Sequence, residues 1–599
     1  WKHGDVWDIE DSSSNKDWSI VRINSNVTTD KSHTQLGMII EDNQSLTVNT
    51  DRDINNTWYL ELNGSLELND DAQLIQSMTS DLVTGANGRI LRRQDGSSNV
   101  YWYTYMSSPV GALGVTTLSD NNAATNNTNN TAFQFNNLKE GDGSLVQFTN
   151  AYNEVGKIST RWMYTFQNGL TYYDWAHYTQ TTNLDPGVGY VHKGTGNAGT
   201  TQEYLFEGKP NNGTILIAAD DVDGDSGNES QADVTLTSTL IGNPYPSAID
   251  AHTFIDDNAG VIEGTLYLWQ QWAGDNHILR EYDGGYATLN LMTKIRAYQF
   301  EGLNGDNNGI QNGTKTPTRY LPVGQSFLTE VIADGNIEFN NAQRVFKKEA
   351  NGETVFFRDA ERNTKGKEDN KETMALMRLD FSTSNGLKRE IVLGFSNFTT
   401  EGYDYGYDAK MFETKTEDMF TMWKGHDMIA HAYPSIHPTN VIPVGINVTG
   451  IYTYKIKATA FDNMDPAQKI YLRDKYTDTY FDLRSKEAYD FTSERGRIED
   501  RFEIVFMGQK SKNSSIDLSE SINIYFNNTT DMLYVKGLET SAESLTLINI
   551  LGQQVMVINT PSKETLSNGI HMTNLNTGVY IVSITTTNKN TIEKKIKID

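Results

Sequence analysis

The sequence contains 599 residues, with 77 aspartates and glutamates against 50 lysines and arginines, which gives a formal net charge of −27. A surface this acidic repels phosphate backbones, so we expect no nucleic-acid partner. The absence of cysteine excludes disulfide bonds, cysteine-ligated metals and thiol nucleophiles. No run of about 18 apolar residues occurs, so no membrane-spanning helix is predicted.

The first 100 residues carry a repeat of about twenty residues. The segment at 45–49 (SLTVN) recurs at 65–69 (SLELN). Such a period, with one inward apolar strand per repeat, is typical of a β-solenoid, in which each coil buries its apolar face against its neighbours. We therefore predict an all-β chain that opens with the end of a solenoid, residues 1–100. A plain β-meander is the alternative.

The start of the chain has no signal-peptide pattern, and Trp1 lies in sequence that already has the character of a folded domain. Since few solenoid coils are visible, we expect further coils before Trp1.

An aromatic-rich β region is predicted next, at residues 101–357. Within it, 105–111 (YMSSPVG) resembles 241–247 (IGNPYPS), and 185–191 (DPGVGYV) resembles 321–327 (LPVGQSF). Both pairs are separated by about 137 residues, which favours two related β-units.

Two linkers divide the remainder of the chain. Residues 358–372 are charged and poor in apolar residues, as linkers are. Residues 373–507 alternate apolar and polar residues in strand-length runs, which predicts an antiparallel β-sandwich. A short polar segment, 508–520, leads to the last unit, 521–599.

The last unit alternates apolar and polar residues over about 80 positions, which predicts a small Ig-like β-sandwich. Three of its segments carry a more specific pattern: 548–554 (INILGQQ), 575–584 (LNTGVYIVSI) and 594–598 (KKIKI). In their order, spacing and C-terminal position they resemble the type A C-terminal sorting domain of the type IX secretion system of Bacteroidota. Residues 525–528 (YFNN) depart from the family, which often has Tyr-Pro-Asn-Pro there.

This resemblance implies that the chain is secreted cargo. The positions that match the family's motifs are Gly552, Gln553, Gln554, Gly578, Tyr580, Lys594, Lys595 and Lys597. Domains of this family cross the periplasm, pass an outer-membrane translocon, are bound by a barrel-shaped shuttle protein and are usually removed by a sortase. The implied location is the outer-membrane cell surface or the medium.

An acidic turn at 219–227 (ADDVDGDSG) is a candidate calcium site. Asp221, Asp223 and Asp225 alternate, and alternate carboxylates in a turn can face one calcium ion, which takes six to eight oxygen ligands. The glycine is misplaced for an EF-hand loop, so a solvated acidic loop is the alternative. Calcium is the one cofactor that the sequence suggests.

The segment 267–285 (YLWQQWAGDNHILREYDGG) is a candidate glycan-binding site. Trp269, Trp272 and Tyr282 offer flat rings on which sugar rings can stack. Strand alternation would instead direct Trp269 and one neighbour into a sandwich core, where buried aromatic residues are common.

The sequence lacks G-x-x-x-x-G-K-[ST], H-E-x-x-H and G-x-S-x-G, the commonest phosphate-binding, zinc-protease and hydrolase signatures. We therefore predict a non-enzymatic passenger, an adhesin or a structural surface protein. The alternative is a secreted carbohydrate-binding protein or carbohydrate-active enzyme with its site in the aromatic-rich region.

Overall fold

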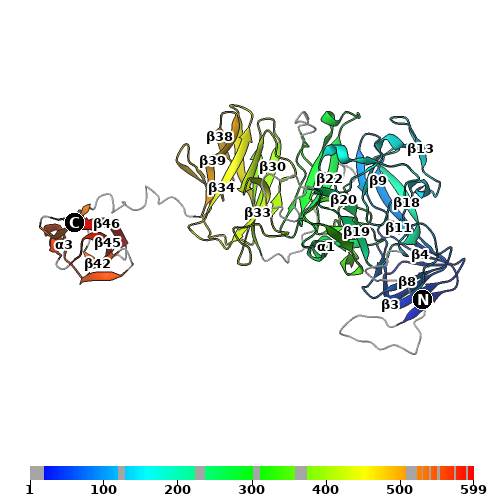
Figure 1. The fold of residues 1–599 in the computed structure, drawn as a ribbon, viewed down its shortest axis with the longest axis horizontal. Helices are drawn as coiled ribbons and strands as arrows, with labels where there is room; N and C mark the ends of the chain where they lie inside the picture. Colours follow the sequence, from blue (N-terminus) through cyan, green and yellow to red (C-terminus); the bar gives the residue numbers. More distant parts are fainter. Residues whose placement is uncertain are drawn as a thin grey trace. The chain divides into compact units, whose positions relative to one another are not determined.

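The computed structural model describes residues 19–118, 129–222, 237–300, 311–357, 374–506, 523–528, 530–538, 541–549, 553–572, 575–587 and 591–598. The chain forms two compact units, Trp1–Met507 and Gly508–Asp599 (Figure 1). Strands dominate both units, which confirms the all-β prediction. None of the helices in the described parts of the chain has the length and apolar character needed to cross a membrane.

Residues 19–97 form a solenoid-like region of two largely parallel sheets. The first contains β1 (Ile20–Ile23), β3 (His33–Ile40), β5 (Asp53–Leu62), β7 (Gln73–Gln76) and β8 (Asp81–Thr84), and the second contains β2 (Val27–Thr29), β4 (Ser45–Val48), β6 (Ser65–Leu68) and β9 (Arg89–Ser97). Strands β4 and β6 pair in parallel with Leu46 opposite Leu66, at the spacing of the sequence repeat. Parallel neighbours exclude the plain meander and confirm the solenoid prediction.

The core of the solenoid-like region is aliphatic, and one row of amides crosses it. Leu46 and Leu66 are fully buried between the sheets. Gln35, Asn56 and Gln76 lie opposite one another on β3, β5 and β7 and are equally buried. The Gln35 side chain donates a hydrogen bond to Oδ1 of Asn56, so the stacking of coils also pairs buried polar groups.

The aromatic-rich region contains two larger sheets and several short ones. The larger sheets are formed by β10 (Tyr103–Met106), β17 (Tyr190–Lys193), β15 (Tyr164–Thr165) and β16 (Ala176–His177), and by β20 (Thr237–Gly242), β26 (Ser326–Val331), β22 (Leu266–Ala273), β23 (Asp283–Leu289) and β24 (Lys294–Ile295). Strands β11 (Val110–Gly111), β12 (Lys139–Glu140) and β18 (Thr201–Pro210) extend the second solenoid sheet through β9.

Short elements complete this region. The remaining strands are β13 (Gln147–Thr149), β14 (Lys157–Ser159), β19 (Ile215–Ala219), β21 (Ala248–Asp250), β25 (Tyr320–Leu321), β27 (Gly335–Phe339) and β28 (Arg344–Val345). The helices are η3 (Phe135–Asn137), η4 (Thr160–Trp162), η5 (Tyr172–Asp174), α1 (Ala251–Asp257), η6 (Leu279–Glu281) and η8 (Asn341–Gln343).

One strand pairing occurs twice in the aromatic-rich region. Strand β10 pairs with β17 so that Met106 faces Tyr190, and β20 pairs with β26 so that Gly242 faces Ser326. Both partners in the second pair lie 136 residues after their counterparts in the first. Two related units would give this arrangement, and the duplication itself stays a prediction.

Residues 374–506 form one eleven-stranded sheet around a core of their own, and part of the sheet packs with Met292 and Ile295 in a second cluster. Its strands, in sheet order, are β37 (Thr479–Asp482), β36 (Tyr471–Asp474), β39 (Gly496–Val505), β34 (Val441–Val448), β32 (Asp418–Trp423), β33 (His426–Pro434), β30 (Lys388–Ser396), β29 (Ala375–Ser382), β35 (Thr453–Asp462) and β38 (Tyr489–Thr492), with β31 (Ala409–Lys410) also on β33. The pairing is not purely antiparallel as predicted, because β30 and β33 run parallel.

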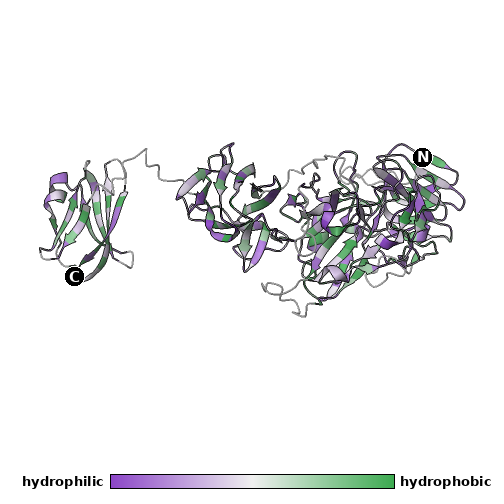
Figure 2. Ribbon diagram, turned by 90° about the horizontal axis from the view of Figure 1, so that it is seen from above, coloured by the Kyte–Doolittle hydropathy of each residue, from purple (hydrophilic) through white to green (hydrophobic). Residues whose placement is uncertain are grey.

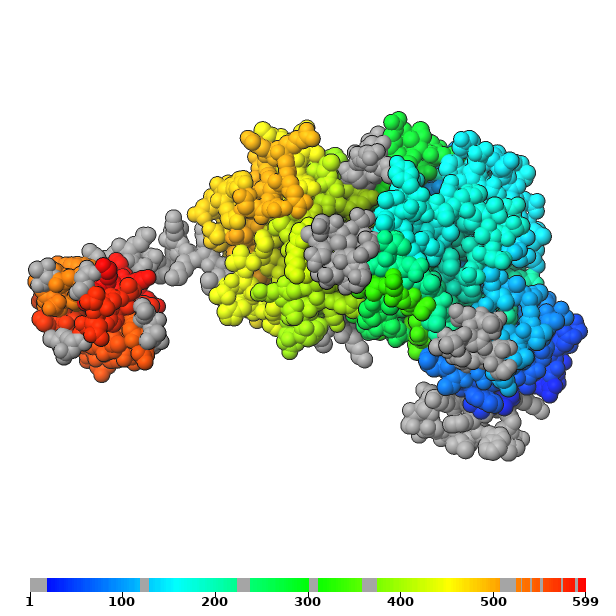
Figure 3. All heavy atoms as spheres, in the orientation of Figure 1, coloured from blue at the N-terminus to red at the C-terminus, as the bar shows by residue number. Residues whose placement is uncertain are grey.

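Buried charges tie this third region to the aromatic-rich region. The Lys410 ammonium lies 2.9 Å from Oε1 of Glu263 and 3.0 Å from Oε2 of Glu330. The Tyr267 hydroxyl also donates to the Lys410 carbonyl oxygen, at 3.3 Å. Both regions therefore belong to the same compact unit, in which the blue, cyan, green and yellow segments succeed one another in Figure 3.

The second unit is a small sandwich. One sheet contains β40 (Asn523–Asn527), β41 (Met532–Lys536) and β44 (Ile570–His571); the other contains β43 (Gln554–Asn559), β42 (Ala542–Asn549), β45 (Gly578–Thr586) and β46 (Thr591–Ile598). A short helix, α3 (Lys563–Asn568), begins after its N-cap Ser562. Hydrophobic and hydrophilic residues alternate along the strands (Figure 2), as a half-buried sheet requires.

Candidate ligand-binding pocket

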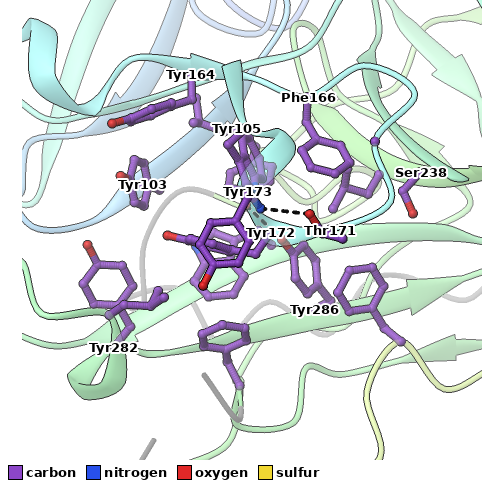
Figure 4. A pocket seen from close by; sticks show the side chains of 18 of the residues that line it. Tyr103, Tyr105, Tyr164, Phe166, Thr171, Tyr172, Tyr173, Ser238, Tyr282 and Tyr286 are labelled. Atoms are coloured by element: carbon purple, nitrogen blue, oxygen red, sulfur yellow. Dashed lines mark hydrogen bonds between the residues drawn. The ribbon is translucent and has the colours of Figure 1, made fainter. Parts of the chain in front are cut away.

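A cavity of about 580 Å³ lies in the first unit and is lined mainly by aromatic rings. Strands β10, β17, β22, β23 and β26 supply its floor, and the segment 169–175 supplies part of its rim (Figure 4). The aromatic lining residues are Tyr103, Tyr105, Trp162, Tyr164, Phe166, Tyr172, Tyr173, Trp175, Trp269, Tyr282, Tyr286, Phe300 and Phe412. We refer to this cavity as the aromatic pocket.

Three rings lock the floor of the aromatic pocket. Tyr105 stacks on Trp269 with ring centroids 6.1 Å apart, and the hydroxyls of Tyr105 and Tyr286 are 3.0 Å apart. Gly284 leaves room for this arrangement, because a Cβ atom there would lie only 2.6 Å from the Trp269 ring. Contacts of this kind hold the rings in fixed orientations, so the floor is preformed.

The rim of the pocket is a turn that presents aromatic rings to solvent. A capping box fixes this turn: the Thr171 side chain accepts a hydrogen bond from the Tyr173 backbone, and Asp174 accepts from the Thr171 backbone at 2.7 Å. The hydrogen bonds that Asp174 accepts from the Thr171 and Leu170 backbones lower the pKa of its carboxyl group. Tyr173 is 81% exposed although it lies over the pocket (Figure 4). An ordered but exposed ring is available to a ligand.

A lysine lies behind one end wall of the pocket. Lys193 is 1% exposed, and its ammonium donates to the Tyr282 hydroxyl at 2.7 Å and to Nδ1 of His277 at 3.0 Å. It also lies 4.3 Å from the ring centroid of Trp162 and 4.6 Å from that of Tyr103. Burial lowers the pKa of Lys193 to about 7, and burial together with the Lys193 charge lowers the pKa of His277 to about 4.

Two polar atoms of pocket-lining residues lack a hydrogen-bond partner within the described parts of the chain. They are Nε1 of Trp269 and Nε2 of His277. A buried donor without a partner costs free energy, so a ligand that supplies a hydrogen-bond acceptor to it would gain binding free energy.

A second, polar depression of about 690 Å³ shares Leu170, Ser238, Phe412 and Glu413 with the aromatic pocket. Glu330 and Lys410 of the buried charge cluster line it. Burial and the neighbouring carboxylate of Glu263 raise the pKa of Glu330.

Two of the three predicted glycan platforms line the aromatic pocket. Trp269 and Tyr282 do so, but each is only 4% exposed, and Trp269 packs in a core cluster with Tyr105, as strand alternation predicted. Trp272 is 6% exposed and packs into a different core cluster on the opposite face of β22. A spacing of three residues on a strand places the two tryptophans on opposite faces.

The other aromatic residues of the pocket were not predicted from the sequence. Eight of them come from segments 101–105 (YWYTY), 162–166 (WMYTF) and 171–175 (TYYDW), whose local density of aromatic rings was the available signal. The other three, Tyr286, Phe300 and Phe412, lie elsewhere in the sequence.

The calcium prediction stays open. The Asp221 backbone donates to Oδ1 of Asp334 at 2.8 Å, and its carboxylate accepts from the Thr237 hydroxyl at 3.3 Å. Asp223 and Asp225 lie outside the described residues. Within the described ranges, no group of three or more histidine, aspartate or glutamate side chains is placed to hold a metal ion.

The predicted sorting-signal residues lie on one sheet of the second unit. Gln553 precedes β43, Gln554 begins it, Gly578 and Tyr580 lie on β45, and Lys594, Lys595 and Lys597 lie on β46 with exposed side chains. Gly552 lies outside the described residues. The Tyr580 ring is buried, and its hydroxyl donates to the Asn576 carbonyl oxygen at 2.8 Å.

Two family models match the chain. One, described as "Domain of unknown function (DUF8693)", matches residues 1–506, and the other, described as "Secretion system C-terminal sorting domain", matches residues 523–599. The second match confirms the resemblance to type IX cargo, so the chain is exported to the cell surface or the extracellular space and interacts with the type IX machinery.

Other comparisons add little. The search of curated proteins returned no match. A solved structure titled "Biofilm associated protein - BSP domain" is 11% identical and aligns over 84% of this chain and 97% of its own, with a TM-score of 0.11. A TM-score this low does not indicate a shared fold.

Proposed function

This chain belongs to the DUF8693 family and ends in a type IX sorting domain, and from this premise we propose that it is a surface or secreted adhesin that binds glycans in the aromatic pocket. The observation that carries the proposal is the aromatic pocket itself. Its volume falls within the range of small-ligand sites, of about 300–1,000 Å³.

The chemistry of the lining supports a sugar ligand. The C–H face of a sugar ring is apolar and flat enough to stack on aromatic rings, while its hydroxyls accept hydrogen bonds at the edges. Tyr105 and Trp269 supply the flat floor, and Tyr173 supplies an exposed ring above it. Nε1 of Trp269 and Nε2 of His277 are buried donors of pocket-lining residues without a partner among the described residues, so a sugar hydroxyl that inserts beside either one gains a hydrogen bond.

Binding of the purified full-length chain to a broad glycan panel tests the proposal. We expect Tyr173→Ala to weaken binding about tenfold or more, because it removes a stacking surface. Trp58→Ala, which removes a 47% exposed ring of the solenoid-like region, is the matched control and should leave binding unchanged. A blank panel would contradict the glycan proposal and favour a structural surface protein.

Calcium is a separate part of this proposal. If Asp221, Asp223 and Asp225 hold calcium, the thermal midpoint of the full-length chain should rise with added calcium and fall with chelator. Asp223→Asn together with Asp225→Asn should remove that response. A midpoint that is insensitive to calcium would leave the segment as a solvated loop.

A carbohydrate-active enzyme is the second candidate, favoured by the carboxyl groups beside the aromatic pocket. Glu330 lines the polar depression with a raised pKa, and Glu413 lines both cavities. A carboxyl group that keeps its proton can act as a general acid in glycoside hydrolysis. This candidate would be supported if the unsubstituted chain releases reducing ends from a polysaccharide and the Glu330→Gln variant does not.

The specific secretion partners are also a proposal. We infer that the translocon, the shuttle barrel and the sortase recognise the second unit. Deletion of residues 515–599 should trap the product in the periplasm, and normal export of the truncated chain would refute the inference. A further test asks whether the secretion machinery recognises the exposed charges on β46. It replaces Lys594, Lys595 and Lys597 by glutamine and, as the charge-preserving control, by arginine.

A further inference from the structure

We propose that the Lys193–His277 end of the aromatic pocket is a subsite for an anionic substituent of the bound sugar, a uronic acid carboxylate or a sulfate ester. This inference rests on the proposed glycan binding and names the class of sugar that the site takes.

The first support is the environment of the Lys193 ammonium. The partners of Lys193 among the described residues are neutral: the Tyr282 hydroxyl, Nδ1 of His277 and the faces of the Trp162 and Tyr103 rings. No carboxylate in the described parts of the chain pairs with it. Burial of a charge without a counterion is costly, and such groups are typical of functional sites.

Two of the other buried lysines, Lys410 and Lys315, each have an oxygen partner that carries full or partial negative charge. Lys410 lies between two carboxylates, and Lys315, which is 3% exposed, donates to the Phe356 carbonyl oxygen at 2.8 Å. The Lys193 ammonium has neither a carboxylate nor a carbonyl oxygen as its partner among the described residues, and a single layer of side chains separates it from the cavity. All four of its surrounding side chains, Tyr103, Trp162, His277 and Tyr282, line that cavity.

The second support is the hydrogen-bonding direction of His277. A protonated lysine is only a donor, so Nδ1 of His277 accepts its hydrogen bond and Nε2 carries the ring proton. That Nε2–H is the donor without a partner noted above. Lys193 therefore fixes a tautomer whose buried Nε2–H has no partner among the described residues, and the positive charge behind it favours an anionic acceptor that inserts there.

The stacking of His277 keeps this donor in place. Its ring lies on Trp162 with centroids 4.4 Å apart and an interplanar angle of 16°, and 4.9 Å from the Tyr101 ring. The net charge of −27 repels long polyanions, but its effect on a short charged sugar is largely screened, because the Debye length is about 8 Å at physiological ionic strength.

The test compares a charged sugar with its neutral counterpart on the full-length chain. At pH 6, where Lys193 carries its proton, we expect tetragalacturonic acid to bind about tenfold tighter than its carboxyl-reduced tetrasaccharide. A sulfated galactan tetrasaccharide and its desulfated form make the parallel pair. Tighter binding of the charged sugar in either pair supports the subsite. The pair with the larger preference shows whether the subsite takes a carboxylate or a sulfate.

Three variants separate this role from a structural one. Lys193→Met removes the charge, and His277→Phe removes the donor while keeping a ring on Trp162. Both should reduce the preference to about twofold or less, because each weakens the charged sugar more than the neutral one. Lys315→Met is the matched control, because it removes a buried lysine away from the pocket, and it should keep the preference.

The outcomes distinguish the two proposals. Equal affinity of the intact chain for charged and neutral sugars, or a preference that survives in Lys193→Met, would overturn the anionic subsite and leave glycan binding standing. Absence of binding to every sugar would overturn both.

Discussion

The solenoid-like region and the aromatic pocket use buried groups in opposite ways. In the solenoid-like region each coil repeats its neighbour, so Leu66 stacks beneath Leu46 and Asn56 lies beside Gln35. In the pocket, strands from distant parts of the chain converge, and Lys193 is buried beside rings rather than beside a counterion. Repetition aligns like groups and pairs some of them, although Oε1 of Gln35 and Nδ2 of Asn56 still lack a partner among the described residues. Convergence brings unlike groups together and leaves the Lys193 ammonium among neutral partners.

The largest effect is expected in the solenoid core. Leu66→Ala removes a fully buried side chain between two coils that cannot collapse onto the gap. We expect it to lower the free energy of unfolding by about 3–4 kcal/mol. Glu67→Gln, on the same strand but directed outward, is the control and should change it by less than about 1 kcal/mol. Urea denaturation of the full-length chain measures both, and a small effect of Leu66→Ala would mean that the coils do repack.

Lys193→Met should act in the opposite direction and stabilise the fold. Burial lowers the pKa of Lys193 from 10.5 to about 7, so the penalty is complete below pH 7 and is relieved as pH rises toward 10.5. The unfolded state binds the additional proton in this window, so the stability of the unsubstituted chain rises with pH there. We expect a gain on the order of 3 kcal/mol at pH 7.

The pH dependence distinguishes this explanation from simple repacking. The gain from Lys193→Met should fall by more than half at pH 9.5, whereas the cost of Leu66→Ala, which removes no titratable group, should be the same at both pH values. An advantage that is equal at both pH values would mean that the ammonium is not the costly group.

The row of amides gives a smaller effect. Asn56→Ala removes the acceptor of the Gln35 amide and leaves that buried donor without its partner. We expect a loss of about 1–3 kcal/mol. The double variant Gln35→Leu with Asn56→Leu removes both polar groups and should cost less than Asn56→Ala alone. If it costs more, the amides contribute through more than their mutual hydrogen bond.

The sequence predicts more about the solenoid-like region and the sorting domain than about the aromatic pocket. The recurrence of SLTVN as SLELN specifies both the parallel pairing and its register, because stacked coils place equivalent residues opposite each other. The sorting domain is identified by the order and spacing of its motifs. In both cases the information lies in neighbouring residues or in one repeat.

The pocket is only partly predictable, for a physical reason. Local aromatic character marks Trp269 and Tyr282, but Tyr105 reaches Trp269 only because β10 joins β17 while β22 joins β26. Strand periodicity does not fix such non-local pairings. Lys193 has no sequence signal at all, since a lysine on a short strand is ordinarily exposed.

Substitution of Tyr173 is expected to change the stability of the fold least, although we assign this residue the largest role in ligand binding at the rim of the pocket. Tyr173 is 81% exposed, and the turn that carries it is held by Thr171 and Asp174 rather than by the ring itself. Tyr173→Ala should therefore change the free energy of unfolding by less than about 0.5 kcal/mol. Tyr105→Ala, which removes a buried floor ring, should cost about 3 kcal/mol or more. A weakened glycan affinity in a Tyr173→Ala chain of unchanged stability would separate contact with ligand from support of the fold, whereas a destabilised Tyr173→Ala chain would make the rim part of the core.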